Sequence, residues 1–199
     1  MLRTLPLMLF CLLLLPGASA AKADTERLLA EVPEGWVTGL ERHTGNLHLV
    51  EYFPADTTST WTEKLSVESL SGEGLPDPLD FVQGWALDQA ELCEAFRDNP
   101  IFAGFENGYP TVVRMLECGR NKRTGKPLLT MLKVIKGNRS LYTITRIWRL
   151  PAQVEAAGDS ADTPPPPLPI EQDVVAGWSQ ALSRVQVCDP ALPAHPCPD

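Results

Sequence analysis

TVVRMLECGRNKRTGKPLLTMLKVIKGNRSLYTITRIWRL, the sequence of residues 111–150, alternates apolar runs with polar turns. The three runs, rich in apolar and β-branched residues, lie at 111–118, 127–135 and 141–150. The turns between them, at 119–126 and 136–139, contain Gly, Asn and basic residues. Short apolar runs joined by such turns are typical of β-hairpins. We therefore expect three consecutive strands that form an antiparallel meander.

Three further strands are expected upstream of this meander. Residues 36–43 and 47–53 flank Gly45-Asn46, a two-residue hairpin signal. Such a turn would place His43 directly opposite His48. Residues 61–70 then alternate in character, which favours a strand with one buried face.

Three helices are expected. A short capped helix at 24–29 would end before Pro33. A second would begin at Asp77-Pro78, carry an apolar stripe at helical spacing and stop near Asn99-Pro100, followed by a loop from Gly104 to Pro110. The stripe contains Phe81, Trp85, Leu92, Cys93 and Phe96. A third amphipathic helix is expected at 170–187.

This element order predicts an α+β fold, an antiparallel sheet of about five to six strands with a central and a C-terminal helix packed on it. The chain length suits one such domain. Its main part would span 21–150, followed by a Pro/Ala-rich linker or loop at 151–169, the C-terminal helix at 170–188 and a Pro-rich tail at 189–199.

Residues 1–20 have the features of a secretory signal peptide. Arg3 is followed by an apolar run from Leu5 to Leu15 and by the small-residue motif Ala18-Ser19-Ala20. We expect cleavage after Ala20, a periplasmic or secreted product, and no membrane span in the mature chain.

Four cysteines remain after that cleavage, an even number typical of disulfides in an exported protein. Three connectivities are possible. We favour Cys93–Cys118, within the folded middle, and Cys188–Cys197, which flanks the Pro-rich tail. Metal binding is the competing interpretation, but no C-x-x-C motif occurs.

The charge is distributed unevenly along an acidic chain. Residues 111–150 contain ten basic residues and one acidic residue, whereas the whole chain has a formal charge of −8. A basic patch of Arg120, Lys122, Arg123 and Lys126 is expected in the first turn. It could bind anionic polymers, or pair with the acids of the protein itself. Nucleic acid is the less favoured ligand, because few aromatic residues interleave with these charges.

A carboxylate on an apolar strand face is the most specific site signal. Glu63 shares its expected face with Trp61 and Leu65, and a buried carboxylate needs a partner. Arg146 lies on the equally apolar face of Trp148. We expect a Glu63–Arg146 pair, with Trp61 and Trp148 beside it, that either fixes strand register or binds a ligand.

No pattern in the sequence identifies a catalytic residue, a cofactor or a metal site. There is no G-x-S-x-G or Walker motif, and His43 and His48 have no identifiable third ligand.

Three short segments carry a family resemblance. EYFPA at 51–55, WTEKLSV at 61–67 and ITRIWR at 144–149 resemble motifs of uncharacterised exported proteobacterial proteins. The element order is similar to the PsbP-like α/β/α sandwich. This resemblance, over residues 36–188, implies a fold and a cell-envelope location, and it assigns no catalytic residue.

The sequence therefore favours a non-catalytic binding or envelope-associated module whose partner would be an envelope protein or a small ligand. The alternatives are a hydrolase-type enzyme with a carboxylate site around Glu63, and a binder of anionic polymers through the basic meander at 111–150.

Overall fold

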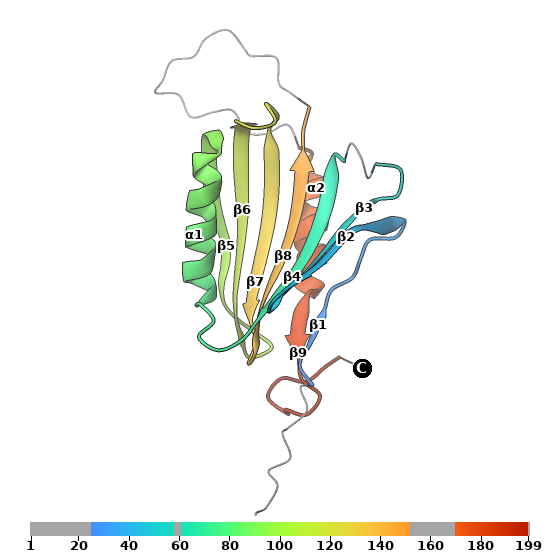
Figure 1. Cartoon of the computed structure of the whole chain (residues 1–199), viewed down its shortest axis with the longest axis vertical. Coiled ribbons are helices and arrows are strands. Elements are labelled where there is room, and N and C mark those ends of the chain that lie inside the picture. The colour runs from blue at the N-terminus through green and yellow to red at the C-terminus, as the bar shows by residue number, and fades with distance from the viewer. Residues whose placement is uncertain (1–24, 58–60, 152–169, 199) are drawn as a thin grey trace, which may run out of the picture.

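A computed structural model describes residues 25–57, 61–151 and 170–198 of the chain (Figure 1). The signal peptide expected at 1–20, and the expected linker after residue 151, lie outside the described residues. No helix within the described ranges is long and apolar enough to cross a membrane.

A seven-stranded antiparallel sheet forms the centre of the structure (Figure 1). The strand order is β2-β3-β4-β8-β7-β6-β5, so β2 and β5 are the edges. The strands are β2 (Trp36–Thr44), β3 (Leu47–Pro54), β4 (Glu63–Ser71), β5 (Cys93–Glu106), β6 (Tyr109–Asn121), β7 (Leu128–Lys136) and β8 (Ser140–Arg149). The expected meander corresponds to β6, β7 and β8, and the α+β class is confirmed.

Two helices cover opposite faces of this sheet. The helix α1 (Pro78–Glu91) packs Val82 against Leu132 and Val134 of β7. The helix α2 (Gln172–Arg184) packs Trp178 and Leu182 against the other face, in the cluster that contains Met131. Both faces of β7 are therefore buried, as its apolar sequence requires.

The end of the first long helix differs from the prediction. Asp77 caps α1 as expected, accepting a hydrogen bond from the Leu79 amide at 2.8 Å, but the helix stops at Glu91 instead of Asn99. The residues after it form β5, which pairs with β6 along its length. Asn107 and Gly108, with φ of 47° and 79°, make the tight turn between them, where a loop was expected. This extra strand makes the sheet larger than the five to six strands predicted.

A second sheet, of two strands, forms where parts of two other helices were predicted. Residues Arg27–Leu29, expected in a helix, form β1, which pairs antiparallel with β9 (Gln186–Cys188). The C-terminal helix ends at Arg184, so the expected helix at 170–187 is too long. In both places the backbone forms hydrogen bonds with a strand that is distant in the sequence, and local helix signals carry no information about such a partner.

Both favoured disulfides are present. Cys93 at the start of β5 is bonded to Cys118 of β6, and Cys188 is bonded to Cys197. The first bond joins the edge strand to its neighbour, and the second closes the C-terminal tail on β9.

Lys133, in the middle of β7, is fully buried. Its ammonium donates to the Leu182 carbonyl at 2.8 Å and to the Val185 carbonyl at 2.6 Å. It also pairs with the Glu106 carboxylate of β5 at 2.5 Å. The last carbonyls of a helix lack partners within the helix and carry partial negative charge, so this ammonium satisfies the end of α2.

We predict that Lys133→Met lowers the free energy of unfolding by about 2–4 kcal/mol, because the Val185 carbonyl and the Glu106 carboxylate lose their ammonium partner and the Leu182 carbonyl keeps only the Val185 amide. Urea denaturation measures the change. Lys126→Met, in an exposed turn, is the matched control and should cost less than about 0.5 kcal/mol. Equal stability of the two variants would contradict this role of Lys133.

Candidate functional site

Glu63 and Arg146 lie together on the face of the sheet that α2 covers. Arg146 donates to Glu63 Oε1 through Nε at 3.1 Å and through Nη2 at 2.6 Å. The strand register explains the contact, because Glu63 is opposite Trp148 and Arg146 is opposite Leu65, one diagonal step away. The two side chains are only 23% and 16% exposed.

Aromatic rings enclose this ion pair. The Arg146 guanidinium lies 3.4 Å from the Trp178 ring centroid and 5.0 Å from that of Trp36, with Trp148 at 5.9 Å. Burial lowers the pKa of Arg146 from its ordinary value, and the Glu63 carboxylate opposes that shift. The pair is thus held inside a tryptophan layer, and Trp178 of α2, which sequence reasoning did not connect with it, is its nearest ring.

Trp61 is not part of this cluster. Its ring lies 3.7 Å from the Arg149 guanidinium and 5.3 Å from Lys64 Nζ. Strand β4 begins only at Glu63, so the alternation expected from Trp61 onward does not extend to that residue. The structure therefore brings together Glu63, Arg146 and Trp148, whereas Trp61 contacts the cations of Arg149 and Lys64.

The four residues of the expected basic patch lie in and beside the β6–β7 turn. Arg120 pairs with Glu94 at 3.3 Å, and Lys122 donates to the Glu91 carbonyl at 2.8 Å. Arg123 and Lys126 are exposed in the turn. Two of the four cations thus already have partners in α1 and β5, which favours pairing within the protein over an anion-binding surface.

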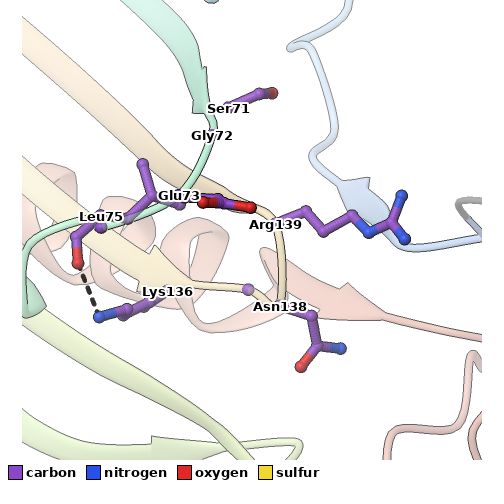
Figure 2. A pocket seen from close by; sticks show the side chains of 9 residues that line it. Ser71, Gly72, Glu73, Leu75, Lys136, Asn138 and Arg139 are labelled. Carbon is purple, nitrogen blue, oxygen red and sulfur yellow. Dashed lines mark hydrogen bonds between the residues drawn. The ribbon is translucent and has the colours of Figure 1, made fainter.

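A hollow of about 780 Å³, whose walls are mostly polar residues and glycines, lies at one end of the sheet, between the loop after β4 and the β7–β8 turn (Figure 2). Lys136 Nζ donates to the Leu75 carbonyl at 2.8 Å, as Figure 2 shows, and the Gly72 amide donates to the Arg139 carbonyl at 3.0 Å. Leu75 is the one large apolar residue among its walls. Small-molecule sites are lined mainly by hydrophobic and aromatic side chains, of which this hollow has one, so we interpret it as a junction between two loops.

The outer end of β5 exposes large apolar side chains. Ile101, Phe102 and Phe105 are 49%, 38% and 72% exposed. Register places Phe102 opposite Val113 and Phe105 opposite Pro110, with a bulge between Pro100 and Phe102. Phe102 and Phe105 are three positions apart and therefore lie on opposite faces of the edge strand. Sequence reasoning missed this surface, although Asn107-Gly108 is a hairpin signal that could have located the strand.

The C-terminal tail holds the tip of this hairpin. Asn107 Nδ2 donates to the Val187 carbonyl at 2.9 Å and to the Pro196 carbonyl at 3.0 Å. His195 Nδ1 lies 2.8 Å from the Asn107 carbonyl, and its ring stacks on Tyr109. Burial, followed by the nearby Glu26 and Asp189 carboxylates, raises the pKa of Tyr109 to about 12. The tip is therefore fixed between β9 and the disulfide-closed tail.

Within the described ranges, one group of three side chains has donor atoms close enough to share a metal ion. It consists of Glu41, His43 and His48 on the β2–β3 hairpin.

No protein-family model and no curated protein matches the chain. Among solved structures, it is similar to PA94, a protein of unknown function from Pseudomonas aeruginosa, with a TM-score of 0.44, 13% identity and coverage of 81% of this chain and 96% of that one. It is also similar to LpqN, involved in cell envelope biogenesis of Mycobacterium tuberculosis, with a TM-score of 0.39, 12% identity and coverage of 81% and 82%. Values this low assign neither a fold family nor a function. The resemblance to exported proteobacterial proteins and to the PsbP-like sandwich stays a prediction.

We predict that Glu63 and Arg146 stabilise the fold as a unit. Arg146→Met should lower the free energy of unfolding by about 2 kcal/mol, because it leaves a largely buried carboxylate without a donor. The coupling free energy between Arg146→Met and Glu63→Gln should be at least about 1 kcal/mol. A double-mutant cycle by urea denaturation measures this energy. If the double variant's loss of stability equals the sum of the two single losses within about 0.5 kcal/mol, the two residues do not act together.

Proposed function

We propose that this chain is an exported, non-catalytic binding module that takes an extended segment of a partner protein along the outer edge of β5, beside which no strand of the described residues lies. The exposure of Ile101, Phe102 and Phe105 on an edge strand is the observation that carries the proposal.

The position of these side chains favours a strand as the ligand. Phe102 and Phe105 lie on opposite faces of β5, so one flat surface packed on either face would cover only one of them. A strand added beside β5 would project its side chains to both faces, and would pair with the outer backbone groups of β5. The occupant is therefore an extended segment with apolar residues on both of its faces.

Only the first half of β5 has features that oppose pairing with a strand of another chain. The first half contains Ala95 with a φ of 59°, and Pro100, next to the bulge. It also has the ion pairs Arg97–Glu117 and Asp98–Arg114. Strand irregularity, proline and charge are the usual means of protecting a sheet edge. Residues 101–105 have no charged side chain, which leaves this part of the edge open to a partner.

Export to the periplasm or cell surroundings is supported by the two disulfides, which persist in oxidising compartments, and by the sequence pattern of residues 1–20. We propose a location in the cell envelope, with an envelope protein as partner, because export brings the chain among such proteins.

The Glu63 site favours binding over hydrolysis. A general acid or nucleophile must reach its substrate, but the Glu63 carboxylate accepts two hydrogen bonds from Arg146 inside the tryptophan layer. The pair thus supports the fold that presents β5.

Photocrosslinking tests the edge directly. We expect p-benzoylphenylalanine at position 105 to give one discrete adduct in intact cells, and the same residue at position 87 of α1 to give none. Leu87 is a matched control, since it is an apolar residue that is 69% exposed and belongs to helix α1 instead of the edge strand. Mass spectrometry then identifies the crosslinked segment of the partner.

A synthetic peptide of that segment should bind the purified protein, and Phe105→Glu should weaken binding at least about tenfold while Leu87→Glu leaves it unchanged. Equal adducts at both positions, an adduct to a second copy of this chain, or peptide binding that Phe105→Glu does not weaken would each refute the proposal.

A further inference from the structure

The β2–β3 hairpin brings two imidazoles and a carboxylate to one point. Gly45, with a φ of 60°, and Asn46 form its turn, and His43 lies directly opposite His48. The two rings stack with centroids 3.9 Å apart and planes inclined by 9°. Glu41 is two residues before His43, so its side chain leaves the same face of the strand.

All three donor atoms converge. Glu41 Oε1 lies 3.1 Å from His48 Nε2 and 3.4 Å from His43 Nε2, and all the candidate donor atoms lie within 4.8 Å of one another. A tetrahedral zinc ion with ligands at about 2.1 Å separates its ligand atoms by about 3.4 Å. The carboxylate is thus already at the required distance from both imidazoles.

We propose that Glu41, His43 and His48 form a binding site for Zn²⁺ or a similar divalent transition-metal ion, with a fourth position open to water. Two imidazoles and one carboxylate are the ligands such ions select, whereas Mg²⁺ and Ca²⁺ prefer oxygen ligands alone.

The backbone around the site is fixed before any ion binds. Strand β3 is paired on both sides, with β2 and with β4. The turn is tied to the end of β4, because the Ser71 amide donates to the Asn46 carbonyl at 2.9 Å and the Asn46 side chain donates to the Ser71 carbonyl. A rigid hairpin lowers the entropy lost when side chains assemble around an ion.

The side chains of this site are accessible from solvent. His43, Glu41 and His48 are 68%, 55% and 40% exposed. The site lies by β2, at the opposite edge of the sheet from β5, so it does not depend on the proposed strand-binding function.

Isothermal titration of untagged protein with ZnCl₂ tests the site. We expect one ion per chain with a Kd below about 100 µM, and no detectable binding of Mg²⁺. His43→Gln, His48→Gln and Glu41→Gln should each weaken Zn²⁺ binding at least about tenfold. Glu34→Gln, which removes an exposed carboxylate two residues before β2 and at the other end of that strand from His43, is the charge-matched control and should leave the Kd unchanged.

The three variants change exposed side chains, and their circular dichroism and urea midpoints should match those of the wild type. Zn²⁺ binding weaker than about 1 mM in the wild type, or binding that the histidine variants retain at full strength, would overturn the proposal.

Discussion

The ammonium of Lys133 is the contact on which the arrangement of the molecule depends. A lysine in the middle of a strand covered on both faces cannot remain charged without partners, because desolvation of an isolated ammonium is very costly. Its partners come from two other elements, the carbonyl end of α2 and Glu106 of β5. One buried side chain therefore joins the end of α2 to the sheet and to its edge strand.

The consequences of this contact continue along the chain after α2. Val185, whose carbonyl binds Lys133, leads directly into β9, which pairs with β1 and is closed to the tail by Cys188–Cys197. The tail in turn holds Asn107 at the tip of the β5–β6 hairpin. The exposed apolar end of β5 is therefore presented on a fixed frame. The two proposed sites lie at opposite edges of the same sheet, which allows them to work independently.

Sequence patterns predict the parts of this structure that depend on local chemistry. The Gly45-Asn46 turn, the Asp77 cap and the alternation of the meander each follow from neighbouring residues. The Glu63–Arg146 contact was predictable across 83 residues, because each charge interrupts an apolar strand face. The end of α1 could not be predicted from the sequence. The helical spacing continues through Leu92, Cys93 and Phe96, but pairing with β6 overrides that local preference. Strand β1 was missed for the same reason, since its partner is β9 at the other end of the chain. The third metal ligand, Glu41, needed the geometry of the hairpin, although its i, i+2 spacing from His43 is visible in the sequence.

Amide hydrogen exchange in Lys133→Met, followed by residue-resolved NMR under native conditions, tests the role of this lysine most directly. We expect protection to fall together at the end of α2, in β9 and at residues 101–109, by at least about tenfold more than in β3 and β4. A uniform loss of protection across the sheet, or unchanged exchange at residues 101–109, would contradict the claim that Lys133 holds the edge strand through α2 and the tail.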